Sequence, residues 1–473
     1  MTEPTVVLYE LNEVPWRLVD AYVADHPRST LAGLLRSGTT WTTVNDDAAH
    51  LSPWRTWPTL HRSMYAADHN SFELGQDPQT FRGTDLWEPL DEAGVRVGTF
   101  GVLQSWPPRR HASGGFSVPD TFAGDAATEP PELSTFQRFN LRMTSENAYS
   151  SDAPLSAADL VRTGLDLVRR GLTPASAARL AAHLVRERRD RRFQAARPMM
   201  QVLPSFDLYW RLRRRTRPRF SAFFTNHVAA MMHRYWGDAM PEYATGFDYE
   251  PDPVFATFLD AAMTLADRQL ATIVKALRPG DRLVVAASMG QGPIDHRVDV
   301  SGLMVLDDGP ALARFLGAGP AEQELAMHPM CSLAFGSADA AARAAGTLAR
   351  VVDHREEPLF ETIEQQGATV TFRTRYTPVP DDDPRVAHLL DAPEHAGTYG
   401  ELGLAVRDRM GGSNTAYHIP EGILVDVEVG AVGAGDVRRE INVLDVAPSL
   451  LATVYGVEPP ASMKGAVDDS LFR

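Results

Sequence analysis

The sequence predicts an α/β fold in which a mostly parallel sheet lies between layers of helices. Three short apolar runs have the length and composition of buried strands, at residues 6–11, 220–224 and 282–287. Residues 254–277 have apolar side chains at helical spacing and are followed by the breaker Pro279-Gly280. Alternation of strands with helices favours parallel strands joined by crossover helices.

The N-terminal part repeats this alternation, with strand patterns at 6–11 and 95–100 and helical patterns at 15–23, 31–36 and 87–93. Ligands of such sheets bind beyond the carboxyl ends of the strands. We therefore expect the functional site in the loop after Leu11 and around residues 52–70.

Residues 109–219 differ in character, and we interpret them as an Arg-rich helical insertion. Helical patterns at 157–172 and 174–192 are accompanied by arginine clusters at 186–192 and 211–219. Of the 46 basic residues in the chain, 44 are arginine. The codon bias of a GC-rich genome accounts for that total. The clusters themselves are open to three interpretations: a solvated helix face, a site for an anion, or a contact between subunits.

The second half contains a smaller insertion, predicted as an α+β unit at residues 331–399. Its pattern is a strand at 331–335, a helix at 338–352 and a strand at 369–372. The sheet resumes at 421–427, and 441–454 has the pattern of a strand end followed by a helix. The predicted core therefore consists of residues 1–108, 220–330 and 400–473.

Composition excludes several classes of protein. The chain has 473 residues, of which 44% are hydrophobic and 23% charged, as in ordinary globular proteins. A net charge of −15 argues against a nucleic-acid partner, and the single cysteine excludes an internal disulfide framework. We find no apolar run long enough to span a bilayer and no secretory signal, so we expect a cytoplasmic protein with no membrane partner. The oligomeric state stays open.

Polar residues concentrate in five short segments along this core. Two segments end predicted strands, namely Glu10-Leu11-Asn12-Glu13 and Ser288-Met289-Gly290-Gln291. A third leads from a strand into a helix and contains Asn226, His227, His233 and Tyr235. The other two are Ser52-Pro53-Trp54-Arg55-Thr56-Trp57-Pro58-Thr59, which is followed by His61, Arg62 and His69, and His418-Ile419-Pro420-Glu421-Gly422.

Taken in chain order, the five segments resemble motifs of the alkaline phosphatase superfamily, and most closely those of type I phosphodiesterases and nucleotide pyrophosphatases. The residues 443–451 and Met463-Lys464-Gly465 resemble the structural C-terminal part of that fold. The resemblance implies an alkaline-phosphatase-like fold, with Thr56 as a nucleophile at a helix N-terminus. It also implies that His233 and His418 take part in the site as metal ligands or catalytic groups.

Four positions depart from the ligand set that the resemblance implies: Asn12, Ala229, Ser288 and Met289. None of these side chains brings a charge to a metal ion, so a two-metal clamp is not expected. One Zn²⁺-like ion remains compatible with the sequence, held by His233 and His418 and completed by His227 or Glu10. Strand alternation puts Glu10 on the same side as Asn12.

Two alternatives stay open beside this one-metal site. In a metal-free site, a histidine would deprotonate Thr56, and Arg55 and Arg62 would stabilise the developing anion. In a diverged protein, catalysis is lost and the domain binds an anion or another protein.

The function predicted from the sequence is hydrolysis or transfer at a phosphoric or sulfuric ester of a small biosynthetic intermediate. The partner is then a small anionic substrate, and the cofactor is one divalent ion or none. The predicted catalytic set is Thr56, His233, His418, Arg55, Arg62 and Asn12. The predicted substrate-binding set is His61, His69, Asn226, Tyr235 and Gln291.

Overall fold

The computed structural model describes residues 4–47, 51–149, 157–240, 246, 249–295, 303–324, 326, 330–375, 385–407 and 415–473. The chain divides into two compact units. The first comprises Met1–Leu141, Ser156–His296 and Gly411–Arg473, and the second comprises Arg142–Leu155 and Arg297–Met410. The second unit thus begins earlier than residue 331, the boundary expected from the sequence.

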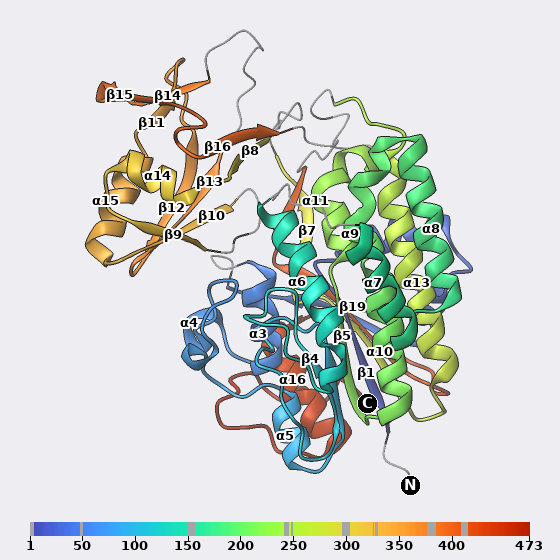
Figure 1. Ribbon diagram of the computed structural model, residues 1–473. Helices are drawn as coiled ribbons and strands as arrows, with labels where there is room; N and C mark the ends of the chain where they lie inside the picture. The colour runs from blue at the N-terminus through green and yellow to red at the C-terminus, as the bar shows by residue number, and fades with distance from the viewer. Residues whose placement is uncertain are drawn as a thin grey trace. The chain divides into compact units, whose positions relative to one another are not determined.

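The first unit is built on an eight-stranded sheet (Figure 1). In spatial order its strands are β19 (Gly435–Asn442), β2 (Thr39–Val44), β18 (Glu421–Glu428), β6 (Arg282–Ala286), β1 (Val6–Leu11), β5 (Phe220–Thr225), β3 (Val97–Phe100) and β4 (Gly115–Val118). β18 is antiparallel to both neighbours, and the other pairs are parallel. The predicted α/β class with a mostly parallel sheet is therefore confirmed.

Successive side chains of β1 point to opposite faces of the sheet, so this strand contributes to the apolar packing on both faces. On one face Leu8 packs in a cluster with Trp57 of α3 (Pro53–Arg62) and Trp87 of α5 (Trp87–Glu92). On the other face Tyr9 lies against Phe223, and its hydroxyl donates to Gln269 of α13 (Phe258–Ala276) at 2.6 Å. Figure 1 shows helices on both sides of the sheet, as this alternation requires.

The remaining helices of this unit are α1 (Trp16–Asp25), α2 (Thr30–Ser37), α4 (Ala66–His69), α7 (Ala157–Arg170), α8 (Pro174–Arg189), α9 (Arg197–Met200), α10 (Val202–Thr216), α11 (His227–Ala239) and α16 (Val446–Ser449). α6 (Ser134–Tyr149) begins in this unit, and its residues from Arg142 onward belong to the second unit. Short 3₁₀ turns are η2 (Pro78–Thr80), η3 (Pro131–Leu133), η4 (Arg191–Ala196), η5 (Phe255–Thr257) and η6 (Val443–Asp445), and η7 (Leu450–Val454) is a π-helical turn. None of the helices that the structure describes combines the length and apolarity needed to cross a membrane.

The segment 109–219 is mostly helical, as expected, but it also contributes β4 to the main sheet. The sequence pattern does not reveal this strand because it is only four residues long. Gly115 begins it with φ of 130°, and a Cβ there would lie 1.7 Å from the carbonyl oxygen of Val97. The close pairing of β3 with β4 therefore depends on this glycine.

The second unit combines helices α14 (Gly309–Leu316) and α15 (Ala338–Leu348) with small sheets. One sheet has the order β12 (Phe360–Gln366), β13 (Thr369–Thr374), β10 (Met330–Phe335) and β9 (Ala321–Glu324), and a second has the order β11 (Val351–Asp353), β14 (Val386–Leu389) and β15 (Ala392–Thr398). β16 (Leu404–Arg407) pairs with β8 (Leu303–Leu306). The helix expected over 338–352 ends at Leu348, because Val351 and Val352 pair with β14 instead.

Candidate functional site

Three neighbouring strands of the main sheet deliver polar residues to one edge. β1, β5 and β6 are parallel neighbours, so their carboxyl ends lie together. Asn12 and Glu13 follow β1, Asn226 follows β5, and Ser288 follows β6. The location expected from the sequence, beyond Leu11, agrees with this arrangement.

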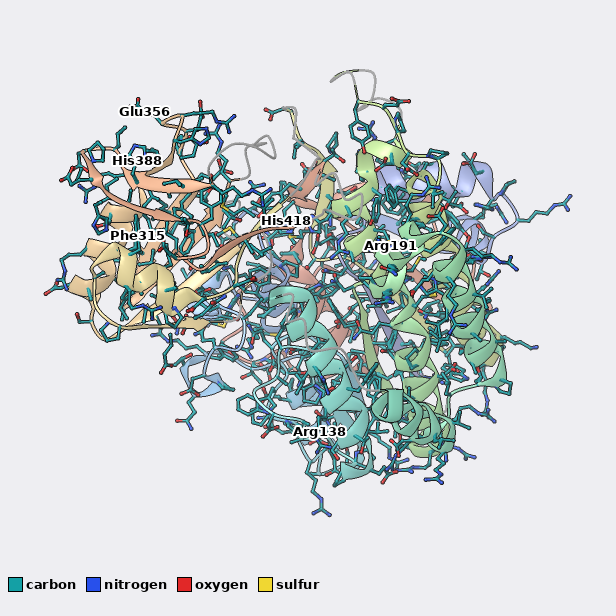
Figure 2. All side chains as sticks on the ribbon, turned by 45° about the horizontal axis from the view of Figure 1, so that its top comes forward. Arg138, Arg191, Phe315, Glu356, His388 and His418 are labelled. Carbon is teal, nitrogen blue, oxygen red and sulfur yellow. The ribbon has the colours of Figure 1, made fainter. Side chains whose placement is uncertain are left out.

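A separate two-stranded sheet adds two more side chains. β7 (Gly290–Pro293) pairs with β17 (Ala416–Ile419), and in this register Gln291 lies opposite His418. His418 is labelled in Figure 2. His233 comes from α11, which packs against both of these strands.

Glu13, His233 and His418 form a cluster suited to a metal ion. Glu13 Oε2 lies 2.9 Å from His233 Nε2 and 3.4 Å from His418 Nε2. One ligand atom from each of the three residues lies within 4.8 Å of the other two. Two imidazole nitrogens and a carboxylate oxygen form a ligand set that zinc takes in catalytic sites, where a further position stays open for substrate or water.

The contacts of the two histidine Nδ1 atoms, which are not directed at Glu13, also favour a metal-binding role for the cluster. His418 Nδ1 lies 2.6 Å from the carbonyl oxygen of Leu51, and His233 Nδ1 lies 3.3 Å from that of Ala416. A carbonyl oxygen only accepts, so both Nδ1 atoms carry the hydrogen. In the neutral rings, each Nε2 then directs a lone pair at the Glu13 carboxylate. The lone pairs and the carboxylate repel each other unless a cation lies between them or the rings are protonated. A backbone carbonyl bonded to Nδ1 is also typical of metal-binding histidines.

Glu13 is held as a carboxylate in a constrained backbone. Its side chain is 2% exposed, and its φ of 60° is in the left-handed region that few non-glycine residues adopt. Burial by itself would raise the pKa of Glu13, but when the rings are protonated, the charges and hydrogen bonds of His418 and His233 hold that pKa well below its usual range. Gln291 Nε2 also donates to Glu13 Oε2.

Asn12 orients Glu13 rather than facing the cluster itself. Its Nδ2 group donates to Glu13 Oε1 at 2.8 Å and to Asn226 Oδ1 at 2.6 Å, and its Oδ1 accepts from Trp57 Nε1 at 2.7 Å. All the hydrogen-bonding groups of this amide are therefore engaged, apart from the second lone pair of Oδ1. The sequence predicts a catalytic role for Asn12, and in the structure its side chain crosslinks Glu13, Asn226 and Trp57.

Asn12→Asp is expected to weaken the binding of a divalent ion by about 10–100-fold. The hydrogen that Asn12 now gives to Glu13 would be replaced by a second negative charge close to the first. Isothermal titration with Zn²⁺ measures the effect, with circular dichroism to check the fold. Tighter binding, or a second bound ion, would show instead that position 12 acts as a ligand.

Thr56 lies on the same side of the sheet as this crosslink and is bonded to Ser288. Thr56 Oγ1 and Ser288 Oγ are 2.8 Å apart, and both residues are at most 1% exposed. Thr56 is the fourth residue of α3, and its N–H is bonded to the carbonyl oxygen of Ser52 at 2.9 Å. It is therefore in the first turn of the helix, but its own N–H is not available to an anion, in contrast to the expectation for a helix N-terminus.

Glu10 does not join the cluster, which corrects its assignment as a possible metal ligand. Its carboxylate is fully buried and lies 2.9 Å from His61 Nε2. The ring of His61 lies between Trp57 and Trp87, with centroid distances of 5.6 and 5.0 Å. Both residues thus belong to the apolar core under α3, and His61 is not placed to bind a substrate.

His227 and His69 are core histidines with both ring nitrogens engaged. His227 Nε2 donates to the carbonyl oxygen of Ala262 at 3.0 Å, and Nδ1 accepts from Thr225 Oγ1 at 2.5 Å. His69 accepts from the N–H of Ser71 at 3.0 Å and lies 3.1 Å from Thr59 Oγ1. Burial lowers the pKa of His227 to about 4 and that of His69 to about 3. The geometry therefore supports neither the metal-binding role expected for His227 nor the substrate-binding role expected for His69.

The two arginines expected to stabilise an anion are engaged in structural contacts. The Arg62 guanidinium makes a two-pronged contact with Asp85, at 2.7 and 3.3 Å, and is almost completely buried. Arg55 donates through Nε to the carbonyl oxygen of Phe72 at 2.9 Å and lies over the Phe72 ring. Both therefore hold the loop that follows α3, and Arg62 has no guanidinium edge left for a substrate.

Of the remaining predicted residues, Tyr235 is placed away from the cluster and Asn226 and Gln291 are placed beside it. Tyr235 is buried against Phe255 and Phe258, at a point where α11 departs from helical geometry. Asn226 is exposed while it accepts from Asn12, so it is the member of this network that an incoming ligand can reach.

Glu13 is in none of the catalytic, substrate-binding or metal sets that the sequence predicts. Strand alternation pairs Glu10 with Asn12, but the strand ends at Leu11, and the positive φ of Glu13 redirects its side chain toward His233 and His418. The sequence signal that could have found it is the acidic residue itself, directly after a strand end.

Comparison with known proteins gave matches among solved structures. No protein-family model matches the chain, and no curated protein matches it. The chain is similar to murine ectonucleotide pyrophosphatase/phosphodiesterase 5, solved as an inactive variant in complex with AMP, with a TM-score of 0.44 and 11% identity over 98% of each chain. It is also similar to a variant of the alkaline phosphatase PafA, with a TM-score of 0.46 and 12% identity over 98% of each chain.

Proposed function

We propose that this protein hydrolyses or transfers a phosphoric or sulfuric ester of a small biosynthetic intermediate, with Thr56 as the nucleophile and one divalent ion in the site. The observation that carries the proposal is the cluster of Glu13, His233 and His418. Its ligand atoms converge, and its two imidazoles are oriented by backbone carbonyls.

The donor set fits a borderline divalent ion such as Zn²⁺. Glu13 would supply the one anionic oxygen, and His233 and His418 would supply neutral nitrogens through Nε2. When bound, such an ion polarises an ester oxygen and offsets the charge that develops on it. The chain's own residues fix the ligands: Gln291 and Asn12 hold the two carboxylate oxygens of Glu13.

Thr56 is positioned by α3, and its hydroxyl shares a hydrogen bond with Ser288. Ser288 stands where the resembling motifs have a charged metal ligand. A neutral hydroxyl there supports a site with one ion rather than two, because it can orient Thr56 but cannot offset the charge of a second cation. General acid–base help is worth roughly 10²–10⁴-fold, so an activated ester or a transfer reaction suits this site better than an unactivated monoester.

The test is metal analysis and turnover on the full chain purified without added ions. We expect about one Zn²⁺ per chain and turnover of at least one of three nitrophenyl esters: a phosphate monoester, a phosphate diester or a sulfate. Removal of the ion by a chelator should abolish turnover, and Zn²⁺ should restore it.

Two outcomes contradict parts of this proposal. Turnover that persists in metal-free protein would exclude the one-metal site and favour acid–base chemistry at the histidines. Metal-loaded protein that turns over none of the esters, yet binds phosphate or sulfate, would favour a binding module.

A further inference from the structure

Helix α8 carries its polar side chains inward and its apolar side chains outward. Its buried residues are Ser176, His183 and Glu187. On the outside, Leu184 is 56% exposed and Val185 is 46% exposed. A surface helix of a soluble protein normally has the opposite arrangement, with its apolar stripe facing the core.

The spacing shows that this inversion is a property of the whole helix. Ala178, Ala181, Ala182 and Val185 occupy positions i, i+3, i+4 and i+7, which place them on one face, and all four are exposed. On the inward face, the fully buried residues are Ser176, His183 and Glu187, and Ala177 and Leu180 are half-buried beside them. The pattern that normally packs a helix onto its core therefore points away from the protein.

The buried polar residues of α8 contact one another and Arg197, the first residue of α9. The Glu187 carboxylate lies 2.9 Å from His183 Nε2 and accepts two hydrogen bonds from Arg197, at 3.0 and 2.7 Å. Thr173 caps the start of the helix by accepting from the N–H of Ser176. The exposed alanine and valine side chains of α8 take no part in these contacts.

The outward face is also strongly basic. It carries four exposed arginines, Arg179, Arg186, Arg188 and Arg189, and Arg191 (labelled in Figure 2) follows directly in η4. The one acidic residue of α8, Glu187, is buried and bonded to Arg197. Residues 157–219 contain 16 arginines and five acidic residues, in a chain whose net charge is −15. Basic residues therefore outnumber acidic ones about three to one in the stretch of sequence that contains this helix.

We propose that the outer face of α8 binds the surface of an anionic phospholipid bilayer. Leucine, valine and alanine flanked by arginine suit a helix that lies in the headgroup region, where apolar side chains enter the acyl boundary and guanidinium groups pair with phosphates. A symmetric contact between two copies would place these arginines against one another, which is unfavourable. The absence of a spanning segment, on which the sequence-based expectation of no membrane partner depended, does not bear on a helix lying on the surface.

Sedimentation with vesicles tests this proposal without any measurement of turnover. A negative result would therefore refute membrane binding and leave the proposed function untouched. The full chain should bind vesicles of phosphatidylcholine containing about one third phosphatidylglycerol and should not bind pure phosphatidylcholine. High salt should release it. Replacing the four exposed arginines of α8 with glutamine should lower partitioning by about 100-fold or more, since each contributes roughly fivefold near such a surface.

The apolar part of the face is tested by Leu184→Ser with Val185→Ser, matched to Val432→Ser with Val437→Ser. Val432 is 93% exposed and precedes β19, and Val437 is 53% exposed and lies in β19; both are far from α8 in the sequence. The α8 pair should weaken binding to the anionic vesicles, and the matched pair should leave it unchanged. Equal effects of the two pairs would overturn the proposal.

Insertion can be observed directly because the chain has one cysteine, Cys331, and it is buried. Val185→Cys labelled with an environment-sensitive dye should show a blue shift and a gain in emission with anionic vesicles, whereas labelled Val432→Cys should not. The proposal is refuted if the wild-type protein does not bind the anionic vesicles. If that protein self-associates or binds an acidic protein through α8 instead, the face is a protein interface.

Discussion

Glu13→Gln should reduce the affinity for Zn²⁺ by at least about 100-fold, a larger loss than changes around a ligand usually cause. The substitution removes the one anionic ligand of the proposed site and leaves the two histidines in place. It also removes the carboxyl group whose pKa, despite its burial, the charges and hydrogen bonds of His418 and His233 hold below its usual range. Competition with a chromophoric chelator measures the affinity, and thermal unfolding checks that the variant is folded.

Glu10→Gln is the matched control for this prediction. It removes an acidic side chain of similar burial three residues earlier, where the carboxylate contacts His61 and not the cluster. We expect it to lower stability, because it replaces a buried charged partner of His61, and to leave Zn²⁺ affinity unchanged in the folded protein. If Glu10→Gln loses the ion and Glu13→Gln keeps it, the assignment of the ligand is wrong.

Thr56→Val should lower turnover of the best ester substrate by about 10³-fold or more, as expected when the nucleophile of a covalent mechanism is removed. Valine has nearly the same shape as threonine, so the packing of α3 is retained while the hydroxyl is lost. Metal content and KM should change little, because Thr56 Oγ1 contacts Ser288 and not the proposed ligands. The readouts are kcat and KM, together with metal content.

Two companion variants separate chemistry from packing at Thr56. Thr56→Ser keeps a hydroxyl and should retain measurable turnover. Ser288→Ala removes the hydrogen-bonding partner but not the hydroxyl of Thr56, so its effect on kcat should be smaller than that of Thr56→Val. Wild-type turnover by Thr56→Val would exclude Thr56 as the nucleophile.

The elements of the core were largely predictable from the sequence because their signals are local. β1, β5 and β6 are apolar runs, and α13 has a long helical period, so each is recognisable without knowledge of its neighbours. The strand β4 was not recognised, because a four-residue edge strand depends on pairing with β3 rather than on its own pattern.

The histidines show the same difference between what local sequence signals reveal and what depends on distant partners. His233 and His418 were selected from motifs, and the structure brings them together with ring centroids 5.2 Å apart. His227, His69 and His61 have the same residue type in the same segments, yet each is bonded into the core. Residue type and spacing do not reveal which ring nitrogens are already engaged, since their partners lie far away in the sequence.

By itself, the sequence determined the fold class, and it supplied the proposed location of the site and the candidates Thr56, His233 and His418. Only the tertiary structure decided that Glu13 rather than Glu10 faces the histidines, that Asn12 is a crosslink, and that Arg62 is held by Asp85. Strand and helix patterns arise from neighbouring residues along the chain. The direction of a side chain beyond a strand end depends on one backbone turn and on hydrogen-bond partners more than 200 residues away, as for Asn12 with Asn226 and Glu13 with Gln291.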